Sequence, residues 1–322
     1  MTKIFTDTFQ GLDRITVENR EVSFSILPQL GGKMISLVCK GTGREFMSLS
    51  GREFRPLRYG EDFGDCDISG FDECFPTIAE GVYPDWPWKG TVVPDHGELW
   101  TLPWKCETKA DRLIMSAHGV RFPYWFIKEM SVEANRVCTR YTLRNLSPHE
   151  FRYIWSAHPL LAVTPGSRII LPGSPRIRTD FSKHQRFGEL LYETSWPEAR
   201  QADGAVVDLS VIRSANEDQA TKVFTTRLEE GWCALYDRKT SDFIKLSFPA
   251  DRIPYVGLWI NEGGWPFDGK PSFNVALEPC TGCPDKLETA VQQGEYASIR
   301  GLDEVSWTLE ITLGRSESPV FG

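Results

Sequence analysis

The 322 residues of the chain include 41% hydrophobic and 12% aromatic residues, which excludes a disordered protein and indicates a folded globule. A net charge of −8 and a pI near 5.3 disfavour nucleic acid and anionic membranes as partners and favour an uncharged small molecule. The sequence lacks an apolar run of membrane-spanning length and an N-terminal signal core, so we expect a cytoplasmic protein that binds no membrane.

Short segments of alternating apolar and polar residues recur along the chain, bounded by Gly, Pro, Asn or Asp as strands in hairpins are. Helical periodicity is confined to two short stretches, 197–202 and 285–293. We therefore expect an all-β fold, a large antiparallel β-sandwich that forms a single domain over residues 1–322. The expected strands lie within 14–27, 112–120, 125–145, 151–163, 232–248 and 305–314.

The segment 47–94 differs from the rest because it is dense in Gly, Pro, Asp and aromatic residues. Long segments of this kind inside a compact domain are usually functional, and the aromatic content argues against disorder. We expect this segment to pack as a loop over one face of a sheet.

Eight cysteines are scattered without a compact framework, which favours reduced, mostly buried thiols over disulfides. Cys280 and Cys283 form a C-x-x-C, but a zinc ribbon would need a second such pair and a redox site would need a βαβ context. We expect neither a metal nor a cofactor.

Three polar residues stand in positions that favour chemistry. His96 lies in the bend "VVPDHGELW", and His158 in "IWSAHPLLAV" precedes a proline that is expected to end its strand. Glu278 closes the apolar strand of "FNVALEPCTGCPD", where Pro279 is expected to stop the ladder. Each residue also has a plainer interpretation: a surface or buried structural histidine, or a solvated surface acid.

Four stretches, "LPQLGGKMISLV", "PDHGELW", "SAHPLL" and "ALEPCTGCPDKLE", follow one another in the order and approximate spacing of the galactose mutarotase-like superfamily, which contains the aldose 1-epimerases. The chain resembles this family from about Val22 to Leu313. The resemblance implies a supersandwich, a large β-sandwich with its sugar site in an open cleft on one sheet.

The resemblance also implies catalytic roles for the same three residues. His96 matches a histidine that contacts the sugar near its ring oxygen, His158 matches the general acid, and Glu278 matches the general base. Such a pair would open the ring of an aldose to the free aldehyde and close it as the other anomer, without metal or cofactor. Two histidines and a glutamate can also bind zinc, but no H-E-x-x-H spacing supports that alternative.

The family's arginine ahead of the His-Gly motif is absent, and the corresponding region reads "GFDECFPTIAEG". Asp72 and Glu73 in this region are candidate acceptors for sugar hydroxyls, or members of a solvated loop. Trp259, in a tryptophan-rich stretch, is a candidate platform for a sugar ring. The function expected is an aldose 1-epimerase-like isomerase acting on a monosaccharide or sugar derivative. Alternatives are a non-catalytic carbohydrate-binding protein on the same scaffold and another sugar isomerase or lyase.

Overall fold

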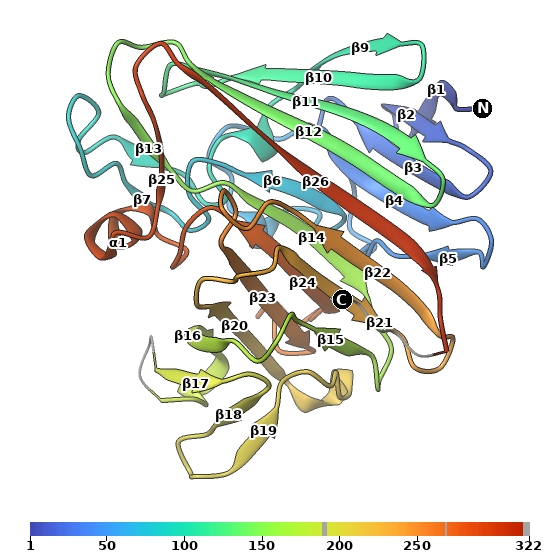
Figure 1. Ribbon diagram of the computed structural model, residues 1–322, viewed down its shortest axis with the longest axis vertical. Coiled ribbons are helices and arrows are strands. Elements are labelled where there is room, and N and C mark those ends of the chain that lie inside the picture. The colour runs from blue at the N-terminus through green and yellow to red at the C-terminus, as the bar shows by residue number, and fades with distance from the viewer. Residues whose placement is uncertain (189–191, 268, 318–322) are drawn as a thin grey trace.

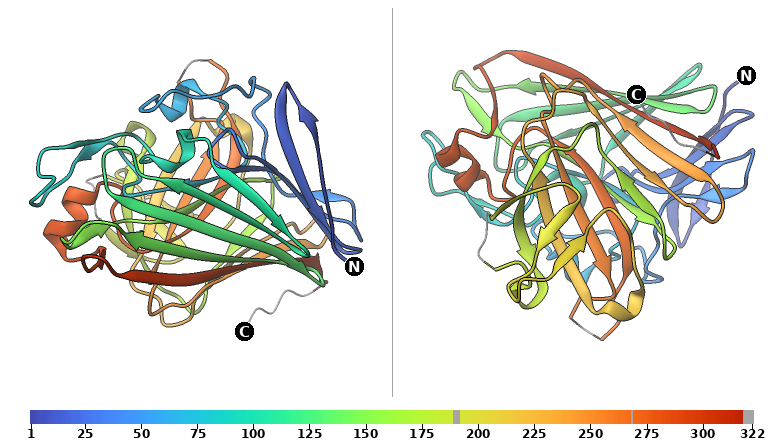
Figure 2. Two further views of the ribbon diagram at one scale, coloured as in Figure 1. Left: turned by 90° about the horizontal axis from the view of Figure 1, so that it is seen from above. Right: turned by 60° about the horizontal axis from the view of Figure 1, so that its bottom comes forward.

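The computed structural model describes residues 1–188, 192–267 and 269–317. Two large antiparallel sheets lie face to face and enclose the main hydrophobic core (Figure 1). Figure 2 shows the same two layers from two other directions, with the N-terminal strands at one edge. The expected all-β sandwich is therefore confirmed.

The larger sheet has twelve strands and carries the site discussed below. Its spatial order is β1 (Lys3–Phe9), β2 (Leu12–Glu18), β3 (Val22–Leu27), β4 (Lys33–Cys39), β6 (Phe71–Cys74), β14 (Ser156–Ala162), β24 (Phe273–Cys280), β23 (Tyr255–Glu262), β20 (Gln219–Thr225), β16 (Arg176–Ser182) and β17 (Glu193–Ser195), with β5 (Arg44–Glu45) paired to β4.

The second sheet has eight strands, in the order β15 (Arg168–Ile170), β21 (Trp232–Tyr236), β22 (Asp242–Ser247), β26 (Glu304–Arg315), β12 (Arg136–Asn145), β11 (Tyr124–Glu133), β10 (Arg112–His118) and β9 (Lys105–Lys109). Three two-stranded ribbons complete the described strands: β13 (Phe151–Tyr153) with β25 (Ala297–Ile299), β18 (Glu198–Arg200) with β19 (Val206–Asp208), and β7 (Gly81–Val82) with β8 (Val92–Val93).

Helical structure in the described ranges is short. It consists of the α-helix α1 (Leu287–Gln293) and the 3₁₀ helices η1 (Phe63–Asp65), η2 (Leu99–Thr101), η3 (Lys183–Gln185) and η4 (Ala215–Glu217). The helix α1 lies within the expected stretch 285–293. Among the described residues, no helix combines the length and the apolar character needed to cross a membrane.

Side-chain alternation explains why the expected strands form. Along β11, buried and partly exposed residues alternate over nine positions, as a strand with one face in the core requires. All six segments expected to contain strands do so, and 125–145 is the hairpin β11–β12. None of the eight cysteines forms a disulfide, and six of them are buried.

Three local expectations were wrong. The stretch 197–202 is not helical, because β18 pairs with β19 across a tight turn in which the amide of Gly204 donates to the carbonyl of Gln201. The prolines Pro159 and Pro279 do not end β14 and β24. Pairing between β23 and β24 continues through Val256 opposite Pro279. Pro279 lacks an N–H, and the pairing of β24 is interrupted only with its other neighbour, β14.

The segment 47–94 also departs from the expected loop. Its residues Phe71–Cys74 enter the larger sheet as β6, between β4 and β14. A four-residue strand flanked by long irregular stretches is too short to stand out by its own alternation. The remainder includes η1 and the ribbon β7–β8, and parts of it cover the sheet as expected.

Candidate active site

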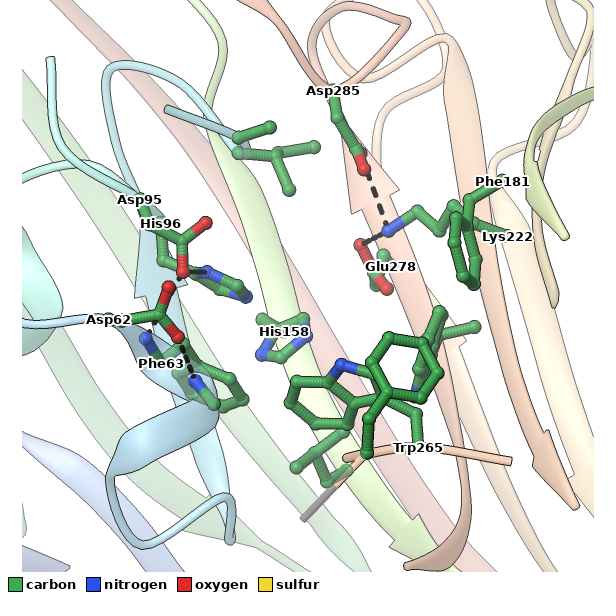
Figure 3. Close-up of a pocket in the computed structure, with 16 residues that line it drawn as sticks. Asp62, Phe63, Asp95, His96, His158, Phe181, Lys222, Trp265, Glu278 and Asp285 are labelled. Carbon is green, nitrogen blue, oxygen red and sulfur yellow. Dashed lines mark hydrogen bonds and ion pairs between the residues drawn. The ribbon is translucent and has the colours of Figure 1, made fainter. Parts of the chain in front are cut away.

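A cavity of about 380 Å³ lies over the face of the twelve-stranded sheet that is turned away from the other sheet. Side chains from strands form its floor, and residues from the loops around η1, His96, Trp265 and Asp285 form its walls (Figure 3). The lining residues are Asp62, Phe63, Gly64, Ile78, Ala79, Asp95, His96, His158, Leu160, Phe181, Lys222, Trp259, Trp265, Phe267, Glu278 and Asp285.

The strand register places His158 and Glu278 next to each other. On β14 and β24, Ser156 pairs with Cys280 and Leu160 with Ala276, so the residues midway between these pairs are opposite one another. Directly opposite residues of neighbouring antiparallel strands point to the same face. An imidazole and a carboxylate, 120 residues apart in the chain, therefore share the floor of the cavity.

His96 reaches the cavity from a loop rather than from a strand. Its backbone is left-handed, with φ of 57°, and Gly97 follows with φ of 72°. The amide of His96 donates to the carbonyl of Ile78 at 2.6 Å, and its ring stacks on Phe63 with centroids 4.2 Å apart. The rings of His96 and His158 are 4.8 Å apart, so the structure brings together all three residues expected to be catalytic.

Gly97 is required for this loop, and we expect Gly97→Ala to destabilise the protein and displace His96. A Cβ atom at Gly97 would lie 2.0 Å from the carbonyl oxygen of Phe75, in addition to the cost of a left-handed alanine of about 1–2 kcal/mol. Gly43→Ala is the matched control, because Gly43 has φ of 73° and open space around it. Denaturant unfolding should show a larger loss for Gly97→Ala; equal losses would contradict the clash.

The two imidazoles differ in charge. Burial opposes the charged form of His96, but Asp95, which accepts from Nδ1 at 2.9 Å, outweighs it and raises the pKa of His96 above its usual value. Burial, together with the positive charges of His96, Lys222 and Lys33, lowers the pKa of His158 well below its usual value. Of the two imidazoles, that of His96 is therefore the one that carries the proton.

Glu278 is fully buried and forms an ion pair with Lys222 of β20. Burial raises the pKa of Glu278, while the ammonium of Lys222 lowers it and the carboxylate of Asp285 raises it. Lys222 also lies 3.5 Å from Asp285, and the attraction of both acids outweighs the burial of Lys222 and raises its pKa (Figure 3). Glu278 keeps one oxygen, Oε1, without a hydrogen-bond partner among the described residues.

The strand beside Glu278 leaves room for that ion pair. Gly257 of β23 lies opposite Glu278, and a Cβ atom at Gly257 would come within 3.2 Å of Lys222 Cε and 3.3 Å of Glu278 Oε2. A glycine in a strand often marks such a close approach. Glycine at this position thus lets the lysine cross from β20 to the glutamate on β24.

Asp180 belongs to the same group of charges. It is the unpaired residue at the register shift between Thr179 and Phe181 of β16, a β-bulge that turns its side chain toward Asp285. Burial and the neighbouring Asp285 carboxylate raise the pKa of Asp180 to about 8. Lys222 therefore faces three acids, one of which holds a proton at neutral pH.

Asp72 lies beside the catalytic candidates but does not line the cavity. It pairs with His158 across β6 and β14, is buried, and contacts Lys33 at 3.2 Å. Burial raises the pKa of Asp72 to about 7, although Lys33 opposes that change. Lys33 also forms an ion pair with the buried Asp67, so Asp72 belongs to a buried charge cluster beneath the site.

Glu73 points to the opposite face of β6, into the core between the sheets. Its carboxylate accepts hydrogen bonds from the Tyr141 hydroxyl and the Trp155 indole, both at 2.9 Å, and lies 3.5 Å from the Lys128 ammonium. Adjacent residues of a strand face opposite sides, so Asp72 and Glu73 could not both reach the sugar. The structure does not bring Glu73 to the cavity, and the hydroxyl contact expected of it has no geometric basis.

Trp259 is half-buried and lines the cavity on β23. Its ring lies 5.7 Å from that of Trp265 at 90°, and Phe63, Phe181 and Phe267 add further aromatic faces. The cavity therefore has aromatic surfaces as well as acids. Of the residues expected to bind substrate, Trp259 alone lines the cavity directly.

Sequence reasoning missed Lys222, Asp285, Asp95 and Phe63. The sequence does hold a signal for Lys222, because the lysine in "QATKVFT" interrupts an otherwise apolar strand. A lysine buried in such a strand needs an acidic partner. Asp285 lies in an irregular segment and Phe63 in the three-residue helix η1, and neither stretch has a periodicity that predicts the direction of a side chain.

Solved structures with this fold cover nearly the whole chain. A galactose mutarotase-like protein from Lactobacillus casei ATCC 334 is 17% identical, with a TM-score of 0.67 over 94% of this chain and 100% of that one. A galactose mutarotase-like protein from Clostridium acetobutylicum is 12% identical, with a TM-score of 0.68 over 98% and 99%. A protein from Escherichia coli K12, named as a candidate aldose 1-epimerase, is 13% identical, with a TM-score of 0.67 over 98% and 100%.

These similarities show that the chain has the galactose mutarotase-like fold, and they confirm the resemblance recognised from its four sequence stretches. No family model matches the chain, and no curated protein matches it by sequence. At 12–17% identity the solved structures establish the fold, so the activity must be argued from the cavity itself.

Proposed function

We propose that the protein is an aldose 1-epimerase-like isomerase that interconverts the α and β anomers of a free monosaccharide. The observation that carries the proposal is the placement of a carboxylate, Glu278, opposite His158 and near a second imidazole, His96, on the floor of one cavity. A volume of about 380 Å³ is within the range of small-molecule sites, roughly 300–1,000 Å³.

The reaction needs one base and one acid. The ionised carboxylate of Glu278 removes the proton of the C1 hydroxyl, the O1–C1 carbonyl forms, and the C1–O5 bond breaks. The ring oxygen takes its proton from His96, whose charge Asp95 stabilises. Rotation about C1–C2 and the reverse proton transfers close the ring as the other anomer and restore both residues.

This division of roles reverses the one that the family resemblance implied for the histidines. His96, with its raised pKa, holds the proton that a general acid must give. His158, with its lowered pKa, is neutral and suits a hydrogen-bond donor that stabilises the developing charge on the sugar oxygens. Glu278 keeps the role of base, and its unpartnered Oε1 is the atom assigned to the C1 hydroxyl.

The charges of the cavity favour an uncharged sugar. The positive charges of the cavity are one lysine and the single proton of the two histidines, and they face four acids, Asp62, Asp95, Glu278 and Asp285. A phosphate monoester would meet net negative charge in a partly dry site. The aromatic wall of Trp259 and Trp265 suits the apolar face of a sugar ring.

Exchange between anomers of glucose, galactose and other free aldoses, followed by polarimetry and by NMR magnetisation transfer, tests the proposal. Wild-type protein should exceed buffer alone for at least one free aldose and should not accelerate the exchange of its 6-phosphate. Quenching of tryptophan fluorescence by a sugar, with no acceleration of exchange, would instead support a non-catalytic carbohydrate-binding protein.

We expect Lys222→Met to move the acidic limb of the pH profile to higher pH. Glu278 is active when ionised, so its contribution is present above its pKa and is lost as the pH falls through that value. The ammonium of Lys222 opposes the effect of burial, and without it the pKa of Glu278 rises further. Each pH unit of movement lowers the rate on that limb about tenfold.

The pH dependence of kcat/KM measures this effect, and Lys33→Met is the matched control. Lys33 is also a fully buried lysine in an ion pair, but it contacts Asp67 and Asp72 rather than Glu278. An acidic limb that stays in place in Lys222→Met, or that moves as far in Lys33→Met, would contradict this role for Lys222.

A further inference from the structure

Three side chains of types that bind soft metal ions meet at the floor of the cavity. One ligand atom each from Cys74, His96 and His158 lies within 4.8 Å of the other two. Cys74 comes from β6, two residues beyond Asp72, and therefore shares the face on which Asp72 pairs with His158. Cys74 and His158 are 0% and 5% exposed, so the cluster is built into the sheet rather than assembled on the surface.

Each of the two imidazoles can offer a nitrogen to a metal ion. Asp95 holds Nδ1 of His96, which leaves Nε2 as the nitrogen available to a cation. A carboxylate in this position is the usual outer partner of a metal-bound histidine, because it fixes the orientation of the ring. Nδ1 of His158 is buried and has no hydrogen-bond partner among the described residues. This unpartnered atom is the second indication of a ligand.

The charges around the cluster also favour a cation at His96. The carboxylates of Asp95, Asp72 and Glu278 all act on the charge of that ring. The positive charges of Lys222 and Lys33 act on His158 instead, and each of these lysines forms an ion pair with an acid. The aromatic rings of Phe63 and Trp100 pack against the ring of His96.

One thiolate and two imidazoles form a donor set that suits zinc, with the fourth position open to the cavity. Bonds of about 2.0–2.3 Å to a tetrahedral ion place neighbouring ligand atoms about 3.3–3.8 Å apart. The cluster must therefore contract by about 1 Å at its widest, which is within the reach of side-chain rotation. Binding would release the proton of the Cys74 thiol and the proton of the histidine pair.

We propose that Cys74, His96 and His158 bind Zn²⁺, and that the bound ion excludes sugar from both imidazoles. Zinc would then be an inhibitor of this site rather than its cofactor, because it occupies the nitrogens that the reaction needs. The binding step stands on the cluster alone, whereas the competition with sugar rests on the proposed function.

Titration with Co²⁺ in place of Zn²⁺ tests the binding step, because a cobalt–thiolate bond gives a charge-transfer absorption band. Wild-type protein should show this band, stoichiometric Zn²⁺ should remove it, and Cys74→Ser should lack it. Cys280→Ser is the matched control and should keep the band, since Cys280 is equally buried and lies in the same row of the sheet, beyond Ser156.

No band in the wild-type protein, or a band that persists in Cys74→Ser, would overturn the site. If circular dichroism shows that Cys74→Ser is unfolded, His158→Ala replaces it, and an unchanged affinity for Co²⁺ would then overturn the proposal.

The competition is tested separately in the exchange assay, where Zn²⁺ should raise the apparent KM for sugar in wild type and much less in Cys74→Ser. A wild type that is active and binds cobalt, yet is not inhibited by Zn²⁺, would overturn the competition. A wild type without activity would contradict the proposed function and leave the cobalt result standing.

Discussion

Glu278→Gln is expected to lower the rate of anomer exchange by roughly 10²–10⁴-fold, the usual contribution of one positioned acid or base. The amide has nearly the same shape as the carboxylate but cannot accept the proton of the C1 hydroxyl. The substitution removes the ion pair with Lys222, but the carboxylate of Asp285 remains 3.5 Å from the ammonium and still offsets part of its buried positive charge. The loss should therefore fall on kcat more than on KM or on folding.

Glu73→Gln is the matched control for this experiment. It removes a buried carboxylate from the same sheet, but from the face that Tyr141 and Trp155 cover. We expect it to lower the denaturation midpoint while the folded fraction keeps its exchange rate. Magnetisation transfer between the anomers, with the folded fraction measured by circular dichroism, separates the two effects. Equal rates for wild type and Glu278→Gln would contradict the role of Glu278 as base.

The contrast between Asp72 and Glu73 shows what sequence reasoning could not decide. Two adjacent acids in a strand must face opposite sides, but the sequence predicted no strand at 71–74, because four residues between irregular stretches show no clear alternation. With β6 in place, the alternation assigns Asp72 to the side of His158 and Glu73 to the core. The longer strands, such as β11 and β12, carried enough alternation to predict the sandwich.

The candidate site was predictable in part for a similar reason. Motifs identified His96, His158 and Glu278, but their meeting in one cavity depends on the register of β14 against β24, and register is set by long-range pairing. The charge of His96 depends chiefly on its sequence neighbour Asp95, whereas that of His158 depends on Lys222 and Lys33, which are distant in the chain. The sequence could therefore supply the residues, whereas their protonation required the folded arrangement.

His96→Asn is the second large effect that we expect, a decrease of roughly 10²–10⁴-fold together with loss of the alkaline limb of the pH profile. His96 gives its proton as an acid, so its contribution is present below its pKa and is lost as the pH rises through that raised value. Asparagine tolerates the left-handed backbone that His96 adopts at φ of 57°, so the loop should keep its conformation. The pH dependence of kcat/KM measures both effects.

His158→Asn is the comparison that separates the two histidines. If His96 is the acid, His158→Asn lowers the rate because the imidazole N–H of His158 is lost, yet its alkaline limb remains because Asp95 still holds the proton on His96. Removal of the positive charge in His96→Asn should, in turn, raise the pKa of His158, because that charge is one of the causes that lower it. An alkaline limb that disappears in His158→Asn and survives in His96→Asn would assign the proton to His158 and restore the roles that the family resemblance implied.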